Sequence, residues 1–284
     1  MNLYSKTFTP MLLKEIKKPF NDKNYIFELK FDGIRVLIYA NPKNINIISR
    51  NGQNLTSKFP ELLSIKNLVK DKCIFDGELV VLENGIPNFK KIMARTISKK
   101  QDYLKSPVSF VCFDIIYKNK DLTNLPLIKR KEILNTYPDT DNFIKIKYIK
   151  EQGTNLFKII KQKNLEGIIA KKIESKYHIN KRTDDWVKIK NIKTDDFYIL
   201  GYKEGNINSS ILLGKKENNN LVPIGKVSIG TNSNAFILIK KQKELNSSLS
   251  KDYTYIIPNL KCEIDYLEYT KNKKLRHPVF RRLI

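Results

Sequence analysis

The sequence predicts an α+β protein that ends in a separate, smaller all-β unit. Its 284 residues, 41% of them hydrophobic and 29% charged, suffice for one large or two modest domains with buried cores. Short β-rich runs and helical stretches follow one another without the regular strand and helix alternation of a parallel-sheet protein. Beyond residue 192, strands separated by glycine and asparagine clusters dominate, which predicts the all-β unit.

Most of the expected helices lie in the first part, residues 1–192. β-branched and aromatic residues predict strands over residues 25–31, 34–40, 44–49, 73–82, 108–117, 167–172 and 186–190. Apolar residues three or four positions apart predict helices over 57–69, 88–104 and 151–163. Neither a P-loop nor a dinucleotide-binding glycine pattern occurs, so any nucleotide must bind on another scaffold.

The second part, residues 193–284, has a pattern of short strands with one helix. Strands are predicted over 197–202, 210–215, 221–229 and 262–270, and the helix over 234–246. This size and order are typical of a five-stranded barrel of the oligonucleotide-binding (OB) type. The polar stretch 192–196 that leads into it is expected to act as a hinge.

The composition indicates a polyanionic partner. Lysine and arginine number 53 against 29 acidic residues, a net charge of +24 that attracts nucleic acid, although an A+T-rich gene would also enrich lysine. Three scattered cysteines exclude a disulfide framework and a zinc cluster, and no segment has the pattern of a secretion signal or a membrane span. We therefore expect a cytoplasmic protein with no membrane partner.

The strand over residues 25–31 carries the first candidate site. Period two places Glu28 and Lys30 on the same, open face of this strand. Gly33 then permits a tight turn, and Arg35 returns on the next strand to the neighbourhood of Lys30. An exposed edge strand followed by an ordinary turn is the alternative interpretation of this K-x-D-G-x-R pattern.

Three later strands repeat the arrangement. Glu78 lies on the polar face of the strand over 73–82, Glu166 precedes the strand over 167–172, and Lys188 and Lys190 alternate with apolar residues. Each strand alone is typical of a half-solvated sheet. Together, the two carboxylates and the three lysines, Lys30 included, indicate a cleft for a metal ion and a phosphate.

In their order along the chain, these motifs resemble those of the covalent nucleotidyltransferases, which include ATP-dependent DNA ligases, RNA ligases and mRNA capping enzymes. The matching segments are Lys30 to Arg35 (K-F-D-G-I-R), Phe75 to Glu78 (F-D-G-E), Phe110 to Asp114 (F-V-C-F-D), Glu166 to Lys171 (E-G-I-I-A-K) and Trp186 to Lys190 (W-V-K-I-K). The flanking segments Pro10 to Leu12, Ser49 to Gly52 and Phe59 to Leu62 resemble in particular the compact ATP-dependent DNA ligases of bacteria and phages.

The resemblance implies a two-lobed nucleotidyltransferase (adenylation) domain over residues 1–192 and an OB-fold domain over residues 193–284. It implies an enzyme that seals nicks: a lysine takes AMP from ATP, AMP passes to the 5′-phosphate, and the 3′-hydroxyl displaces it. ATP and Mg²⁺, or Mn²⁺ in its place, would be required. We expect a monomer acting on nicked duplex DNA in the bacterial cytoplasm or nucleoid, or in a phage-infected cell, with a repair or end-joining protein as a further partner.

The resemblance also implies roles for individual residues. Lys30 is the expected nucleophile, and Lys188 and Lys190 are expected to neutralise the α-phosphate of the bound nucleotide during catalysis. The other expected nucleotide contacts are Glu28 beside the base, Arg35 at the ribose or phosphate, Glu78 at the ribose hydroxyls, Phe113 stacked on adenine, and Arg276. Expected metal ligands are Glu166 and Glu78, and Arg50 is expected at the 5′-phosphate of the nick. Without the resemblance, core packing is the simpler interpretation of Phe113, because Val111 and Ile115 share its face.

The final family motif is incomplete. Arg276 begins a segment that resembles its start, but the chain ends at Ile284 before the Arg, Asp and Lys that orient pyrophosphate in the family. We expect Arg276, Arg281 or Arg282 to take over that task, since their planar forks can hold two phosphate oxygens. Self-adenylylation is then expected to be slower than the later steps.

Two alternatives remain open. An RNA ligase would carry the same motifs, because a sequence does not distinguish a cleft for B-form ends from one for A-form ends. A catalytically inactive OB protein would keep the charge, but it should have lost Lys30, Glu166 or Lys190, and all three are present. NAD-dependent ligases carry a four-cysteine zinc site, which the three cysteines exclude.

The net charge of +24 predicts that DNA binding is mainly electrostatic. Affinity for a nicked duplex should fall steeply and linearly with salt on a log–log plot, because phosphate contacts release counterions. It should vary little with the sequence around the nick. Binding titrations of two unrelated nicked duplexes over a salt series measure both effects, and a flat salt dependence would contradict the prediction.

Overall fold

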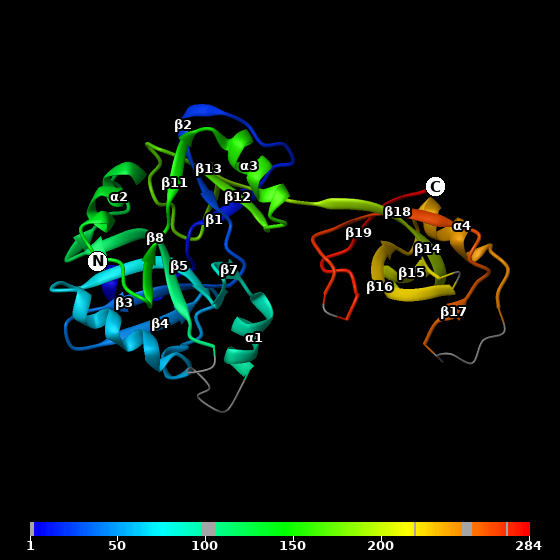
Figure 1. Ribbon diagram of the computed structural model, residues 1–284, viewed down its shortest axis with the longest axis horizontal. Coiled ribbons are helices and arrows are strands. Elements are labelled where there is room, and N and C mark those ends of the chain that lie inside the picture. Colours follow the sequence, from blue (N-terminus) through cyan, green and yellow to red (C-terminus); the bar gives the residue numbers. More distant parts are fainter. Residues whose placement is uncertain (1–2, 98–105, 219, 246–251, 271) are drawn as a thin grey trace. The chain divides into compact units, whose positions relative to one another are not determined.

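The chain folds into two compact units, Met1–Lys190 and Asn191–Ile284. The structure is a computed structural model and describes residues 3–97, 106–218, 220–245, 252–270 and 272–284 (Figure 1). The division expected after residue 192 lies close to this boundary. Lys193 to Asp196, which were expected in a hinge, pair with Tyr266 to Glu263 in the second unit. Only Asn191 and Ile192 separate the last strand of the first unit from that pairing.

The first unit contains two large sheets. The strands of the first sheet, in spatial order, are β1 (Leu12–Glu15), β13 (Arg182–Lys190), β12 (Gly167–Lys172), β2 (Asp22–Leu29) and β11 (Tyr148–Glu151). Those of the second sheet are β10 (Phe143–Lys145), β8 (Ser109–Lys118), β5 (Cys73–Val80), β3 (Ile34–Ala40) and β4 (Ile45–Ser49), with β9 (Lys120–Asp121) beside β8. The first unit also contains a two-stranded ribbon, formed by β6 (Leu82–Glu83) and β7 (Ile86–Pro87). The short 3-10 helix η1 (Leu3–Ser5) lies at its N-terminal end.

The two sheets pack against each other through apolar side chains. Ile26 and Trp186 of the first sheet share one core cluster with Leu37, Ile74 and Phe113 of the second. This burial removes large apolar surfaces from water and is the main favourable contribution to folding. The packed sheets form the two walls of the candidate site.

Helices cover the outer faces of both sheets. Phe157 and Ile160 of α3 (Gly153–Gln162) pack with Phe27 of the first sheet. The 3-10 helices η2 (Thr56–Lys58) and η3 (Pro60–Leu68) and the helix α1 (Phe89–Ile97) cover the second sheet, with Leu62 and Ile92 buried. The predicted helix over 57–69 is therefore a pair of 3-10 helices, and residues 98–104 of the predicted helix over 88–104 lie outside the described residues.

The helix α2 (Leu127–Asn135) was not predicted from the sequence. It buries Leu127 and Leu134, but also Arg130 and Lys131, so charged residues occupy positions where an amphipathic pattern requires apolar ones. Both charges are paired with acids on the strands below. The helix thus covers the sheets through ion pairs as well as through apolar contacts.

The second unit is a barrel of the predicted OB type. Its strands follow the order β16 (Asn220–Gly230), β15 (Asn208–Glu217), β14 (Lys193–Lys203), β18 (Lys261–Tyr266) and β19 (Val279–Leu283), with β17 (Thr254–Tyr255) beside β14. The backbone N–H of Leu275 donates to the carbonyl of Ile224 at 2.9 Å, which joins the segment before β19 to β16. Helix α4 (Asn234–Lys240) contributes Phe236 to the core, and residue 246 of the longer predicted helix lies outside the described residues.

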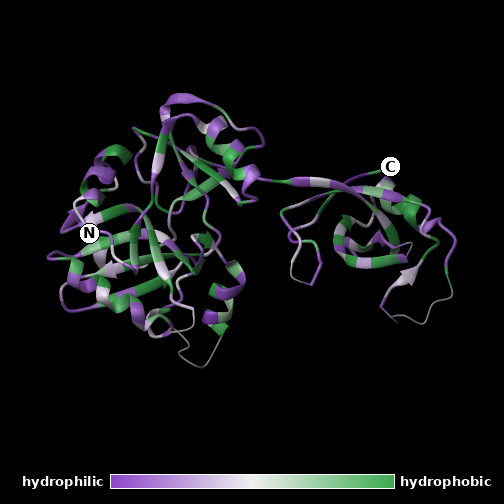
Figure 2. Cartoon of the chain, in the orientation of Figure 1, coloured by the Kyte–Doolittle hydropathy of each residue, from purple (hydrophilic) through white to green (hydrophobic). Residues whose placement is uncertain are grey.

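Apolar residues gather on the strands and hydrophilic ones in the connections of each unit (Figure 2). Within the described ranges, no helix has the length and apolar character that a bilayer crossing requires.

The buried pair Arg130 and Asp114 should contribute strongly to the stability of the first unit. The Nε and Nη2 atoms of Arg130 each donate to a carboxylate oxygen at 2.9 Å, and both side chains are 0% exposed. Arg130→Ala leaves Asp114 charged and unpaired in the core, and it should lower the free energy of unfolding by about 3–5 kcal/mol. Lys129→Ala, which removes an exposed pair with Glu132 on the same helix, should cost less than about 1 kcal/mol. Urea denaturation followed by circular dichroism compares the two variants, and equal losses would contradict this account.

Candidate active site

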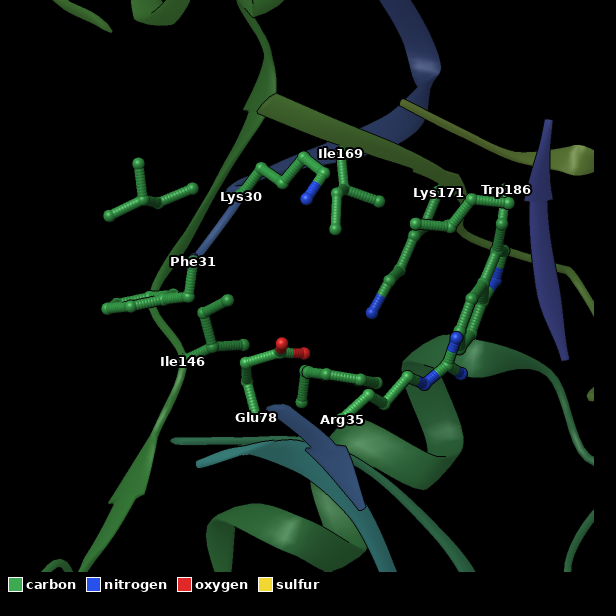
Figure 3. A pocket seen from close by; sticks show the side chains of 11 residues that line it. Lys30, Phe31, Arg35, Glu78, Ile146, Ile169, Lys171 and Trp186 are labelled. Atoms are coloured by element: carbon green, nitrogen blue, oxygen red, sulfur yellow. The ribbon is translucent and has the colours of Figure 1, made fainter. Parts of the chain in front are cut away.

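A pocket lies between the two sheets of the first unit. The space between its walls, part of it open to solvent, is about 440 Å³, and both sheets supply its lining (Figure 3). Its apolar walls are Leu13, Leu29, Phe31, Phe113, Ile146, Ile169 and Trp186, and its charged groups are Lys30, Arg35, Glu78 and Lys171. An apolar slot with a few charged groups suits a flat ring that carries a charged substituent.

Lys30 stands at the end of β2, beside Glu166. Its Nζ lies 2.7 Å from the Oε1 atom of Glu166, and both side chains are mostly buried. The backbone N–H of Lys30 donates to the carbonyl of Gly167 at 3.0 Å, and Gly167 in turn faces Lys190 in the sheet register. At Gly167 a Cβ atom would lie 2.2 Å from the carbonyl oxygen of Ile189, and φ is +154°. Glycine is therefore required at the start of β12, the strand that lies between β13, which carries Lys190, and β2, which Lys30 follows.

Lys188 and Lys190 point to the same side of β13, as their alternation with buried Val187 and Ile189 predicts. The Nζ atoms of the two lysines lie 3.2 Å and 2.8 Å from one oxygen, Oε2 of Glu15. Burial lowers the pKa of Lys188, and the charges of Lys190 and Lys30 lower it further, although the hydrogen bond to Glu15 acts in the opposite direction. The three catalytic candidates Lys30, Lys188 and Lys190 thus lie within electrostatic reach of one another.

Glu28 does not share an open face with Lys30, and that prediction is wrong. The strand β2 lies inside the first sheet with the second sheet and α2 on one side, so Glu28 is 0% exposed. Its carboxylate oxygens lie 2.5 Å from Nζ of Lys131 and 2.7 Å from Nζ of Lys171. Burial raises the pKa of Glu28, but the two lysines lower it and the net direction is down. The contact with the base that we expected for Glu28 remains a prediction.

Arg35 and Glu78 face each other on the neighbouring strands β3 and β5. The guanidinium of Arg35 donates to both carboxylate oxygens of Asp76, at 3.0 Å and 2.7 Å, and the hydroxyl of Tyr177 donates to Asp76 at 2.7 Å. Burial raises the pKa of Glu78 to about 8, and Glu166 also raises it, while the cations Lys30 and Arg35 lower it. Glu78 therefore lies within electrostatic reach of Lys30, Arg35 and Glu166.

Phe113 belongs both to the core and to the pocket lining. Its side chain is 7% exposed and packs edge-on against Trp186 with ring centroids 6.4 Å apart. Ile115 lies in a different core cluster, so the prediction that it shares a face with Phe113 is wrong. The pairing of β5 with β8 shifts register between Asp76 and Gly77, and this bulge breaks the alternation of side chains.

Lys171 is a pocket residue for which no role was predicted, although it ends the matching segment Glu166 to Lys171. Its Nζ lies 4.3 Å from the ring centroid of Phe113 and 4.1 Å from that of Trp186. Burial lowers the pKa of Lys171 to about 8, against the attraction of Glu28. Figure 3 shows the ammonium of Lys171 and the carboxylate of Glu78 pointing into the pocket from opposite walls. The available signal was a lysine directly after an apolar run in a buried strand.

The remaining candidate arginines do not line this pocket. Arg50 is exposed in the turn after β4, and its backbone N–H donates to the carbonyl of Arg35 at 3.2 Å. Arg276 belongs to the second unit, where it lies 2.9 Å from Glu268. Arg281 and Arg282 pair there with carboxylates of β18, Asp265 and Glu263.

The His, Cys, Asp and Glu side chains of the described residues do not form a complete metal site by themselves. In the parts of the chain that the structure describes, no cluster of three or more His, Cys, Asp or Glu is placed to hold an ion. Glu166 lies 2.7 Å from Lys30, and its charge raises the pKa of Glu78, so these two carboxyl groups are near each other and near Lys30. Such a pair fits Mg²⁺, which commonly takes one or two carboxylates and completes its shell with substrate phosphates.

Comparisons with known proteins agree over both units. Residues 9–190 match the family described as ATP dependent DNA ligase domain, and residues 204–283 match the ATP dependent DNA ligase C terminal region. The SPbeta prophage-derived DNA ligase-like protein LigB of Bacillus subtilis is 35% identical over 96% of this chain and 97% of its own length. The multifunctional non-homologous end joining protein LigD of Mycolicibacterium smegmatis is 28% identical over 99% of this chain, which corresponds to 39% of LigD. Mycobacterial DNA ligase D complexed with ATP and MES has a TM-score of 0.62 and 25% identity, covering 100% of this chain and 96% of that one.

The raised pKa of Glu78 predicts a pH-dependent stability of the enzyme without nucleotide. A carboxyl whose folded-state pKa is about 8, against an ordinary 4.5, stabilises the fold fully at acidic pH. That stabilisation is lost as the pH rises through about 8, because the folded state must release the proton it binds more tightly. Glu78→Gln cannot titrate, so its melting temperature should rise relative to wild type from about pH 5 to about pH 9. Thermal denaturation over this range measures the difference, with Glu132→Gln on the exposed face of α2 as the charge-matched control, and parallel curves for wild type and Glu78→Gln would refute the assignment.

Proposed function

The chain belongs to the ATP-dependent DNA ligase family, and we propose that Lys30 is the residue that carries AMP in its reaction. The enzyme uses ATP and seals DNA strands by the nucleotidyltransferase mechanism. The position of Lys30 supports the proposal most directly. Its amine lies beside Glu166 at the edge of the pocket, on the side where Lys188 and Lys190 approach.

The first step is attack of the Lys30 amine on the α-phosphate of ATP. A phosphorus–nitrogen bond forms, the bond to pyrophosphate breaks, and the nitrogen loses its proton, which leaves lysyl-AMP. The amine must be neutral to attack. Lys188 and Lys190 then neutralise the charge that develops on the α-phosphate.

The pocket holds the nucleoside in this proposal. Phe113, Ile169 and Trp186 offer apolar walls for adenine, and the carboxylate of Glu78 accepts hydrogen bonds from the ribose hydroxyls. Arg35 reaches the ribose or phosphate from a fixed position, because Asp76 binds its guanidinium in a bidentate pair. Mg²⁺, or Mn²⁺ in its place, would bind Glu166 and Glu78 together with the phosphates and neutralise phosphate charge.

The remaining steps take place on nicked duplex DNA. AMP passes from Lys30 to the 5′-phosphate, and the adjacent 3′-hydroxyl attacks that phosphate and releases AMP. Arg50 is proposed to bind the 5′-phosphate, since it is exposed directly beside the strand of Arg35. Arg276 of the second unit is proposed as a further nucleotide contact.

The cellular setting is proposed from the relatives and the cysteines. Several relatives are named non-homologous end joining proteins, which supports a role in DNA repair with an end-joining partner protein. Cys73, Cys112 and Cys262 are free and buried, which supports a reducing compartment such as the bacterial cytoplasm or a phage-infected cell. We propose that the enzyme acts as a monomer.

The covalent role of Lys30 predicts a separation between steps. Lys30→Ala should abolish acid-labile AMP labelling of the protein and the sealing of ordinary nicks, because no other group accepts AMP. It should still seal a nick that already carries AMP on its 5′-phosphate, at a reduced rate. Incubation with α-labelled ATP, followed by both nicked substrates, measures this, and Lys129→Ala serves as the lysine control. Labelled Lys30→Ala protein would disprove the assignment.

A further inference from the structure

Glu15 forms ion pairs with both Lys188 and Lys190. It does not belong to any of the motifs that carry the family resemblance. It ends β1, the edge strand of the first sheet, and faces Lys188 in the parallel pairing of β1 with β13. A single oxygen, Oε2 of Glu15, lies 3.2 Å from Nζ of Lys188 and 2.8 Å from Nζ of Lys190. One carboxylate oxygen thus bridges the two ammonium groups.

The geometry makes Glu15 a substitute for a phosphate oxygen. Two ammonium groups on the same side of a strand repel each other, and an anion between them removes that repulsion. Burial raises the pKa of Glu15, but hydrogen bonds from Lys190 and Lys188 lower it and the net direction is down, so the carboxylate is charged at neutral pH. An oxygen of a bound phosphate needs the same two donors.

The position of the Glu15 side chain also allows it to move away from the two lysines. Its side chain is 46% exposed, whereas those of Lys188 and Lys190 are 24% and 26% exposed. The carboxylate therefore approaches the lysines from the solvent side, and moving it away opens no cavity in the core. Partly exposed ion pairs of this kind are weak enough for a multiply charged ligand to replace them.

We propose that Glu15 is an internal counter-anion that holds Lys188 and Lys190 in the enzyme without nucleotide and competes with the phosphates of ATP and of pyrophosphate for them. It is a positioning residue, since it acts through the two lysines. The inference rests on the proposed function, in which these lysines bind the α-phosphate. Its consequence is that this ligase binds ATP and pyrophosphate more weakly than its lysine pair alone would allow.

The test compares Glu15→Gln with a control that removes the same charge from the same two strands. Asp184 on β13 pairs with Lys14 on β1, so Asp184→Asn raises the net charge equally without touching Lys188 or Lys190. Calorimetric titration with the non-hydrolysable analogue α,β-methylene-ATP, with and without Mg²⁺, measures affinity independently of catalysis. Circular dichroism verifies that each variant is folded.

Glu15→Gln should lower the Kd for the analogue by about 3- to 10-fold, and Asp184→Asn should change it by less than about 2-fold. The KM for pyrophosphate in the reversal of lysyl-AMP formation should fall by a similar factor, with no gain in the maximal rate. In a Lys188→Met, Lys190→Met background, Glu15→Gln should have no further effect on binding, because the carboxylate then has nothing to compete for.

Three results would overturn the inference. An equal shift in Asp184→Asn would show a general charge effect, and a shift that persists in the double-lysine variant would show that Glu15 does not act through the lysines. Weaker binding by Glu15→Gln, confined to titrations with Mg²⁺, would identify Glu15 as a metal ligand instead. Failure of the proposed function is distinct: undiminished affinity in Lys188→Met, Lys190→Met would remove the lysines from nucleotide binding whatever Glu15 does.

Discussion

The cost of burying charge between two sheets is the constraint on which the first unit depends. A charge taken out of water is tolerated only when a partner of opposite sign lies against it. Arg130 is therefore bound by Asp114, Arg35 by Asp76, and Glu28 by both Lys131 and Lys171. Arg35 and Lys171 also line the pocket, so the ion pairs of the interior fix the positions of two charged groups of the pocket.

The ion pairs of the three candidate catalytic lysines differ from the interior pairs because they are partly exposed to solvent. Lys30, Lys188 and Lys190 pair with Glu166 and Glu15, and all five keep contact with solvent. Water screens such pairs and lowers the free energy needed to separate them. A charged ligand can therefore separate these pairs more easily than the buried ones. The buried ion pairs therefore stabilise the packing around the pocket, and the partly exposed pairs hold the lysines proposed for catalysis.

The sequence predicted what depends on local pattern. The strands β3 and β12 have the predicted bounds, and Arg35 and Lys171 on them line one pocket. The helix α2 was missed because Lys131 and Glu28, which hold it to the sheet, are 103 positions apart and no local pattern links them. The same separation in sequence explains why Glu28 was wrongly predicted to be exposed. A charged residue is expected at the surface unless its buried partners are known. The bulge that separates Phe113 from Ile115 depends on the neighbouring strand and is likewise invisible in one segment.

The glycine of the K-x-D-G motif shows how sequence reasoning can find the right residue for an incomplete reason. We expected Gly33 to permit a tight turn, but its backbone is not in the left-handed region that favours glycine. A Cβ atom at Gly33 would instead lie 2.2 Å from the carbonyl oxygen of Leu79 on β5. This close approach brings the end of β2, which carries Lys30, against the strand that carries Glu78. A side chain at Gly33 would thus push the segment between Lys30 and β3 away from the strand that carries Glu78. The glycine is therefore required for the close packing of this segment on β5, a requirement that the expected turn alone does not include.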